Sequence, residues 1–179
     1  MSGAAFANGP LITTDRLELW QPAAADFAEF HALTLGDEMR RFLGNHTPNE
    51  ADSFARLMRN AGSWALHGYG SFMVRRRGAA QIIGNCGIFR SLRGFGKGLD
   101  DVPEAGWIID RDYWRRGYAR EAMVAALAWF DQEHGPQRVV CMIEEGNTVS
   151  QALAAKLGFT ERGRHQPEDG PALVLYVRC

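Results

Sequence analysis

Three arginines crowd the start of a helical pattern near the middle of the sequence: Arg115, Arg116 and Arg120. Gly117 and Ala119 lie among them, and their small side chains let the backbone approach a bulky ligand. The first N–H groups of a helix have no intrahelical partner, and the helix dipole favours negative charge at this end. Basic residues therefore conflict with the dipole unless an anion is bound. The pattern predicts a site for phosphate oxygens.

The elements beside this basic segment follow from the spacing of apolar residues. Residues 104–109 contain a short apolar run that predicts a buried central strand. Beyond the turn, residues 119–133 are predicted to form a helix with one buried face. The apolar residues of that face recur at helical spacing: Ala122, Met123, Ala126, Leu127 and Phe130.

The order strand, Arg-Arg-Gly-Tyr-Ala, helix resembles the acyl-CoA pyrophosphate loop of the GNAT superfamily of N-acetyltransferases. Gly117 and Ala119 match that loop, while Trp114 replaces the usual Gln or Arg. The longer pattern Tyr-Trp-x-x-Gly-Tyr-Ala-x-Glu-Ala resembles the Rim-type branch, which acetylates the N-termini of ribosomal proteins. Segments 14–19 and 147–159 also match, so the resemblance spans residues 11–164.

The resemblance implies an α/β (α+β) fold, with a mixed, mostly antiparallel central sheet flanked by helices and splayed at the acyl-CoA site. Residues 1–10 are predicted to be a flexible N-terminus, and residues 11–179 a single domain. Spacing and turn residues predict the elements in chain order. The expected strands are 11–21, 71–76, 81–90, 104–109, 138–143, 159–164 and 172–177. The expected helices are 23–35, one beginning at 47–50, 119–133 and 147–157.

The glycine-rich connection at 91–103 is expected to be a mobile loop that borders the acceptor site. It contains Gly94, Gly96 and Gly98, but a phosphate-binding fingerprint would need Gly-x-Gly-x-x-Gly opening a helix. No helical pattern follows these glycines. The loop interpretation is therefore preferred.

Composition excludes several classes of function. Twenty Lys and Arg against 21 Asp and Glu leave no basic excess, which argues against direct nucleic-acid binding. No apolar run reaches about 18 residues, so no membrane span is expected, and residues 1–10 do not resemble a signal peptide. The odd, widely spaced cysteines Cys86, Cys141 and Cys179 suggest reduced thiols in a cytoplasmic protein. No His-Glu-x-x-His or paired-Cys motif supports a metal site.

The resemblance also implies a reaction in which a neutral amine attacks the thioester carbonyl of acetyl-CoA. Backbone N–H groups of residues 116–120 would hold the pyrophosphate, and Arg115 or Arg116 could reach a phosphate. Backbone groups of the central strand would bind the pantetheine arm, and one N–H there could stabilise the oxyanion. The cofactor-binding residues expected from the loop and the strand are Trp107, Ile108, Ile109, Arg115, Arg116, Gly117, Tyr118, Ala119 and Arg120.

Proton transfer is assigned to two residues through the resemblance. Glu104 aligns with the acidic residue that related enzymes use as a general base. The alternative is a surface charge on a strand, and Asp100 and Asp101 are weaker substitutes. Ala154 occupies the place where many relatives have a tyrosine acid. Ser150 is then the remaining hydroxyl, with solvent as the other proton source.

Asn147 and Ser150 match the family's Asn-x-x-Ser at the start of a helix. Asn147 is expected to cap that helix, to bind the pantetheine arm, or both.

The expected function is acetyl transfer from acetyl-CoA to a primary amine, with a protein or peptide N-terminal α-amine preferred. A small-molecule amine such as an antibiotic, amino acid or polyamine is an alternative acceptor, and a longer acyl chain remains open. Acidic residues near the end of the chain could attract a cationic amine or could simply be solvated: Glu144, Glu145, Glu168 and Asp169. A non-catalytic acyl-CoA-binding module is the alternative from another class. A homodimer would be unsurprising by analogy.

Overall fold

The computed structural model describes residues 9–36 and 49–179. Within these ranges, eight strands form one sheet in the order β1-β2-β3-β4-β5-β6-β8-β7. Every neighbouring pair is antiparallel except β5 and β6. The expected mixed, mostly antiparallel sheet is thus confirmed. The strands are β1 Ile12–Thr13, β2 Leu17–Trp20, β3 Ser71–Arg76, β4 Ile82–Ser91, β5 Val102–Ile109, β6 Val139–Glu144, β7 Thr160–His165 and β8 Leu173–Arg178.

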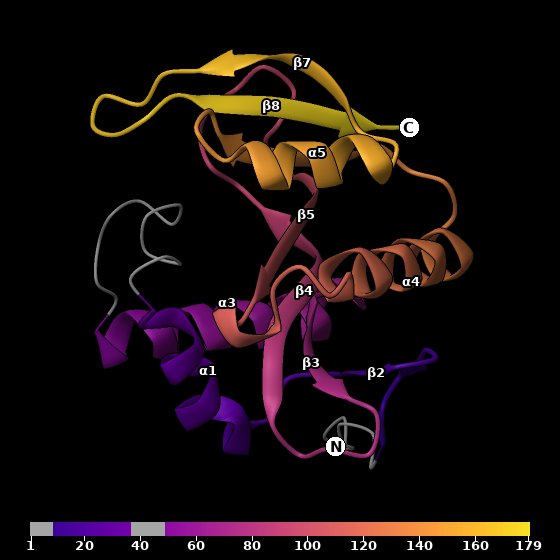
Figure 1. The fold of residues 1–179 in the computed structure, drawn as a ribbon. Helices are drawn as coiled ribbons and strands as arrows, with labels where there is room; N and C mark the ends of the chain where they lie inside the picture. The colour runs from indigo at the N-terminus through magenta and orange to yellow at the C-terminus, as the bar shows by residue number, and fades with distance from the viewer. Residues whose placement is uncertain (1–8, 37–48) are drawn as a thin grey trace.

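Helices cover both faces of this sheet. Figure 1 shows α5 in front of the sheet, α3 behind it, and α4 crossing beside β5. The strands β7 and β8 lie at the top, and β2 to β4 lie below. The helices are α1 Phe27–Thr34, α3 Glu50–His67, α4 Tyr118–His134 and α5 Thr148–Lys156, with 3-10 turns at Ala24–Asp26 and Arg111–Tyr113.

Local signals explain where α3 begins and ends. The Asn49 side chain accepts from the Asp52 N–H at 2.9 Å, and the Asp52 carboxylate accepts from the Asn49 N–H at 3.1 Å. This reciprocal capping satisfies two helix-terminal donors. Gly68 ends the helix with φ +77°, a conformation that favours glycine. Of the helix start predicted at 47–50, residues 49–50 are confirmed. Residues 47–48 lie outside the described residues, as do residues 1–8 of the predicted flexible N-terminus.

The prediction of one strand over residues 11–21 is wrong, because this segment forms the short hairpin β1–β2. Thr14 closes the turn: its N–H donates to the Leu17 carbonyl, and its hydroxyl accepts from the Leu17 N–H, each at 2.9 Å. A threonine side chain that bonds to nearby backbone offers the chain an alternative to continued extension. The polar–apolar alternation continues through the turn and conceals it.

The sheet is splayed between β5 and β6. β4 and β5 pair along their length, from Gly84–Ile109 to Ser91–Val102. β5 and β6 instead share one register pair, Glu104–Val140. Beyond Glu104 the two parallel strands diverge, and a gap opens in the middle of the sheet.

Apolar residues on the two faces of β5 pack in different clusters. Ala105 and Ile109 belong to the cluster that contains the buried face of α4. Ile108 packs with residues of α1 and α3. The buried α4 residues are Ala122, Met123, Ala126, Leu127 and Phe130, which confirms the face predicted from their spacing. In the described part of the chain, no helix is long and apolar enough to span a bilayer.

Candidate active site

The turn from β5 to α4 is bent by two residues with positive φ. Arg115 has φ +60° and Gly117, which precedes α4, has φ +78°. A positive φ is uncommon for a residue with a β-carbon and recurs at functional sites. The Trp114 indole N–H donates to the Ile109 carbonyl at 2.6 Å and fastens the turn to the end of β5. This residue, which departs from the usual family pattern, thus holds the loop.

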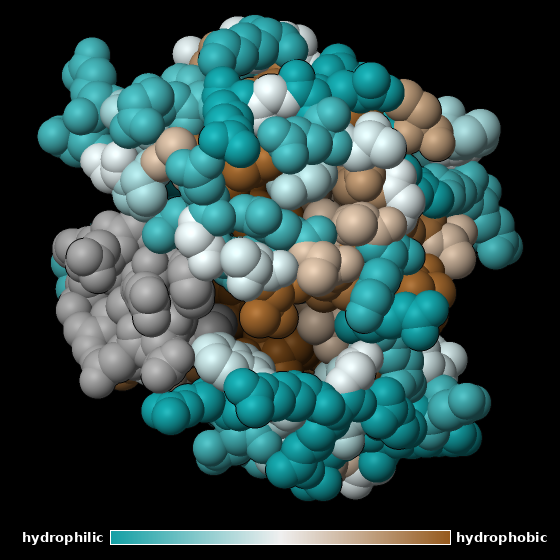
Figure 2. Space-filling view, turned by 45° about the horizontal axis from the view of Figure 1, so that its top comes forward, coloured by the Kyte–Doolittle hydropathy of each residue, from teal (hydrophilic) through white to brown (hydrophobic). Residues whose placement is uncertain are grey.

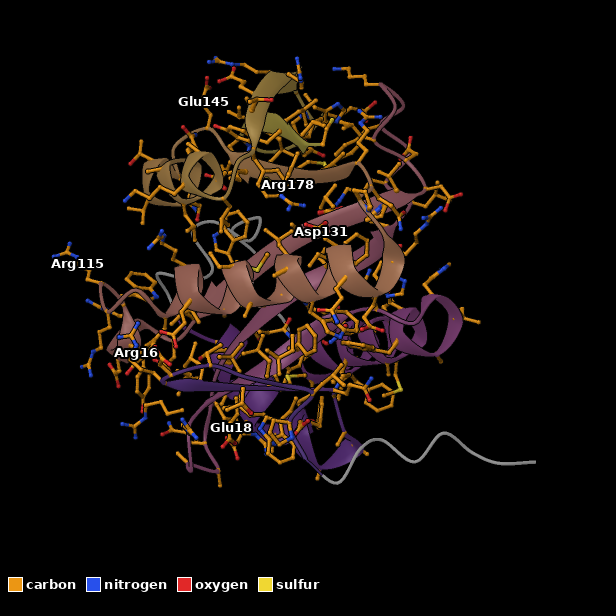
Figure 3. The ribbon with its side chains drawn as sticks, turned by 90° about the vertical axis from the view of Figure 1, so that its right-hand side faces the viewer. Arg16, Glu18, Arg115, Asp131, Glu145 and Arg178 are labelled. Atoms are coloured by element: carbon orange, nitrogen blue, oxygen red, sulfur yellow. The ribbon has the colours of Figure 1, made fainter. Side chains whose placement is uncertain are left out.

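The N-terminus of α4 is open to an anion. Gly117 supplies no side-chain cap, so the first N–H groups of the helix, at Tyr118 and Ala119, are left for another partner. The Arg115 side chain extends away from the body of the molecule at this end of α4 (Figure 3). Arg116 lies over the Tyr113 ring, 5.7 Å from its centroid. The geometry fits a phosphate group at the helix end, with cationic side chains around it.

Glu121 ties this helix end to the β1–β2 turn, a contact that the sequence did not reveal. Its carboxylate accepts from the Thr14 hydroxyl at 2.6 Å and from Arg16 Nε at 2.7 Å. Burial alone would raise the pKa of Glu121, but the hydrogen bonds from Thr14 and Arg16 hold the pKa below its ordinary value. Arg16 also donates to the Arg116 carbonyl at 2.9 Å and lies 4.7 Å from the centroid of the Tyr118 ring. Arg16, from the β1–β2 turn, therefore holds the backbone of the loop that precedes α4.

The gap beside β5 exposes backbone groups to a ligand. The Asp110 N–H donates to Ile83 on the β4 side at 2.8 Å. Because backbone groups alternate along a strand, those of Trp107 and Ile109 face the opposite side, toward β6. Past the Glu104–Val140 pair, β6 no longer meets them. The predicted pantetheine contacts thus fit the backbone of Trp107 and the N–H of Ile109, whose carbonyl already accepts from Trp114. The backbone of Ile108 instead points to β4, where its carbonyl lies 3.6 Å from the Cys86 thiol.

The start of α5 reaches the same gap. The Asn147 side chain accepts from the Ser150 N–H at 3.1 Å, so its role as a helix cap is confirmed. Trp107 Nε1 donates to the Ser150 hydroxyl at 3.3 Å. Ala154, one turn further along α5, is fully buried and carries no hydroxyl. The structure therefore brings together three of the predicted site residues, and leaves Ser150 as the hydroxyl of this helix face.

Glu104 is buried on the other face of β5 and is already paired. Both of its oxygens accept from Arg93, at 2.5 and 2.8 Å, and one also accepts from the Ser91 hydroxyl at 2.5 Å. Glu104 is 3% exposed, whereas the Arg93 side chain is 42% exposed. Glu104 is thus not the surface charge that was the alternative. Both carboxylate oxygens already accept hydrogen bonds. To accept a proton from an amine, Glu104 would have to give up or share one of the hydrogen bonds from Arg93 or Ser91. Arg93 was missed at the sequence level, because nothing in a glycine-rich loop marks its position.

The 91–103 connection is held by many hydrogen bonds. The Asp100 carboxylate accepts backbone N–H groups from residues 93–96, at 2.5 to 3.3 Å. The N–H of Gly96 contributes most to the lowered pKa of Asp100. Phe95 stacks on His165 with centroids 3.8 Å apart, and Leu99 is 2% exposed. These contacts fix the shape of a loop that was predicted to be mobile, and they place Arg93 over Glu104.

The surface is hollowed near the centre of the view in Figure 2, where hydrophobic residues form the floor.

No group of three or more potential metal ligands occurs among residues 9–36 and 49–179. The thiols Cys86 and Cys141 are buried. Burial raises the pKa of Cys86 to about 12 and also raises the pKa of Cys141. Neither thiol is suited to act as a nucleophile.

Comparison with known proteins identifies the family. The model of the acetyltransferase (GNAT) domain matches residues 16–160, so the chain belongs to the GNAT family. An uncharacterized N-acetyltransferase of Bacillus subtilis, YoaA, is 23% identical over 86% of this chain and 85% of its own. A putative GNAT-family acetyltransferase of Bordetella pertussis is 33% identical, with a TM-score of 0.84 over 94% of this chain and 98% of its own.

A third similar structure is RimL, a ribosomal L7/L12 α-N-protein acetyltransferase solved with coenzyme A. It is 15% identical, with a TM-score of 0.75 over 94% of this chain and 96% of its own. At this identity the likeness shows the fold. Together with the family match, these relatives establish an acetyl-CoA-dependent N-acetyltransferase.

Proposed function

We propose that this enzyme acetylates the N-terminal α-amine of a protein or peptide. The observation that carries the proposal is the engagement of both Glu104 oxygens by Arg93 and Ser91. Because both oxygens of this buried carboxylate already accept hydrogen bonds, the site suits an acceptor amine that is largely neutral before it binds. An α-amine has a pKa of about 7.7–8.0, so a useful fraction is neutral at pH 7, whereas an amine of the lysine type, with a pKa of about 10.4, is almost fully charged.

The buried carboxylates also argue against a compact pocket for a cationic small molecule. Among the described residues, the buried acidic side chains are Asp26 and Glu104. Asp26 is paired with Arg75 at 2.7 Å, and Glu104 with Arg93. To bind a buried polycation, a pocket would need a carboxylate that is not already paired with an arginine. The likeness of residues 113–122 to the Rim-type pattern and the fold shared with RimL support the same acceptor.

We assign the steps of the transfer to the residues predicted from the sequence. The N–H groups at 116–120, with Arg115 and Arg116, would hold the pyrophosphate. The backbone of Trp107, the N–H of Ile109 and the Asn147 amide would hold the pantetheine arm. Glu104 would take the proton from the amine, and Ser150 would give one to the departing thiolate. The unbroken strand order from β1 to β7 supports residues 11–179 as one catalytic domain.

The test is thiol release from acetyl-CoA, with mass spectrometry of the products. The panel contains peptides that begin with Ser or Ala, the same peptides with a blocked α-amine, a polyamine, an aminoglycoside and free amino acids. We expect acetylation of the unblocked peptides at the α-amine. Acetylation confined to the polyamine or the aminoglycoside would overturn the proposed acceptor. Bound coenzyme A without turnover on any amine would favour a binding module.

A further inference from the structure

A groove of about 420 Å³ lies between α3 and the loop that carries Arg93. Its wall includes Ser91, whose hydroxyl donates to Glu104 at 2.5 Å, so the groove begins next to the Glu104–Arg93 pair. The other lining residues that matter here are Arg59, Leu66, Arg90 and Leu92. None of the catalytic or cofactor roles assigned above uses this groove.

Positive charge beside the groove exceeds negative charge. The carboxylate that lines the groove, Asp101, is paired with Arg90 at 2.9 Å, and Glu104 beside the groove is paired with Arg93 at 2.5 Å. The Asp100 carboxylate is occupied by the N–H groups of residues 93–96. On α3, Arg56 and Arg59 form no ion pair with any described residue. Among residues 9–36 and 49–179, no carboxylate therefore neutralises these two guanidinium groups.

The environment of Arg56 is consistent with this excess. Burial lowers the pKa of Arg56, and the positive charges of Arg59 and Arg93 lower it further. Arg56 and Arg59 are three residues apart on α3 and so lie on the same side of the helix. Their charges thus converge on the side where Arg93 reaches Glu104. An anion bound here would relieve a repulsion among Arg56, Arg59 and Arg93 that no described carboxylate beside Arg56 and Arg59 offsets.

Apolar side chains border the same groove. Leu66 on α3 is 81% exposed, and Leu92 on the facing loop is 78% exposed. Leucines this exposed on both sides of a groove offer contact area to a partner. Arginines beside exposed leucines suit an extended segment that carries both acidic and apolar side chains.

We propose that this groove binds the residues that follow the acceptor's N-terminus and selects peptides with acidic side chains there. The inference rests on the proposed function, because it assumes a peptide acceptor. The acidic side chain binds Arg59, with Arg56 beside it, and an apolar side chain packs on Leu66 and Leu92. The groove then determines which N-termini reach the active site, and the cofactor site is unaffected.

Two isosteric peptides test the inference. Both begin with Ser, and one carries Asp while the other carries Asn at the second and third positions. For the native enzyme we expect kcat/KM about tenfold higher with the Asp peptide, because a hydrogen bond to a charged group typically contributes about this factor. The preference should decrease as salt is raised, because salt screens exposed charges. Thiol release gives the rate, and mass spectrometry gives the product.

Matched variants locate the preference. Arg59→Gln should reduce the preference to about twofold or less and leave the rate with the Asn peptide unchanged. Arg77→Gln, at an exposed arginine in the β3–β4 turn, is the control and should keep the full preference. Leu92→Ser should raise KM for both peptides alike. Because each replaced side chain is exposed, Tm should not change in any of the three variants. A lowered Tm would therefore reveal a folding defect.

The outcomes separate the inference from the function on which it rests. Equal rates with the two peptides, or a full preference in Arg59→Gln, would overturn the groove while leaving the peptide acceptor in place. Acetylation of free aspartate with both peptides inert would overturn the peptide acceptor and the groove together. Failure to acetylate any peptide while acetyl-CoA still binds would do the same.

Discussion

Trp107 Nε1 lies 3.3 Å from the Ser150 hydroxyl oxygen and donates to it, joining β5 to α5 across the gap in the sheet. A hydroxyl has one proton to donate and two lone pairs to accept with. Because Trp107 fills an acceptor position, the Ser150 proton remains available for another group. The indole thus orients the side chain that we propose as proton donor to the thiolate.

Ser150→Ala is expected to lower kcat by roughly tenfold to a hundredfold, toward the low end of general-acid effects because solvent can replace the hydroxyl. The affinity for acetyl-CoA should change little. Steady-state thiol release measures both. Thr148→Ala, which removes an exposed hydroxyl from the same helix, is the control. An unchanged kcat in Ser150→Ala would show that Ser150 is not the proton donor and serves only as a hydrogen-bond partner of Trp107.

Glu104→Gln is expected to leave acetyl-CoA affinity unchanged and to lower turnover by about a hundredfold or more, because the side chain can no longer accept a proton. The rate should be measured across pH 6–9 with a peptide acceptor. Glu168→Gln, at an exposed acidic residue, serves as the control. If Glu104→Gln and the native enzyme have the same pH profile, Glu104 is not the base.

Gly117→Pro is expected to abolish coenzyme A binding, because proline requires φ near −65° where Gly117 has +78°. Gly135, with φ +74° at the other end of α4, gives a matched control. Both substitutions should lower Tm by similar amounts, but Gly135→Pro should keep its affinity for coenzyme A in calorimetry. Equal affinity in the two variants would contradict the assignment of the pyrophosphate loop.

Glu121 should stabilise the fold in a pH-dependent way. Its pKa is lowered in the folded protein, so the unfolded chain takes up the proton at a higher pH. The stabilisation is therefore fully present above the ordinary value of 4.5 and is lost as the pH falls through the folded-state pKa. Glu121→Gln should lower the free energy of unfolding by about 1 kcal/mol at pH 7, since Arg16 is half-exposed. The difference in Tm between the two proteins should shrink below about pH 4.5; a constant difference would contradict the assignment.

The cysteines should differ sharply in reactivity. Cys86 and Cys141 are buried, and burial raises the pKa of each thiol, to about 12 for Cys86. Cys179 is exposed. Iodoacetamide at about pH 8 should therefore label only Cys179 in the native protein and all three thiols after unfolding. Rapid labelling of Cys86 in the folded state, read by peptide mapping, would contradict the structure.

Local patterns in the sequence were sufficient to predict the elements on either side of the proposed pyrophosphate loop. The apolar spacing that ends at Phe130 predicted α4 over residues 119–133, within one residue of its observed ends, because this signal depends on neighbouring residues. Contacts between distant segments left no such signal. Glu121 meets Thr14 and Arg16 more than a hundred residues away, and no spacing rule connects them.

The residues proposed for the active site show the same division. Asn147 was recognisable as a helix cap because its partner, Ser150, is three residues away. The Arg93–Glu104 pair depends on how Asp100 folds the intervening loop, and composition alone suggested only that the loop would be mobile. The β1–β2 hairpin was missed for a related reason, since the turn is made by a threonine side chain rather than by glycine or proline.

The divergence of β5 and β6 gives the sheet an additional pair of strand edges, in the interior of the fold rather than at its rim. Unpaired strand edges are templates for the addition of a strand from another molecule, and proteins usually cover them. The pantetheine arm would cover the edge of β5 with amides of its own. In the proposed mode of binding, the cofactor would act as a removable cap on this edge, and depletion of acetyl-CoA would leave the edge open to another strand as well as deprive the enzyme of substrate.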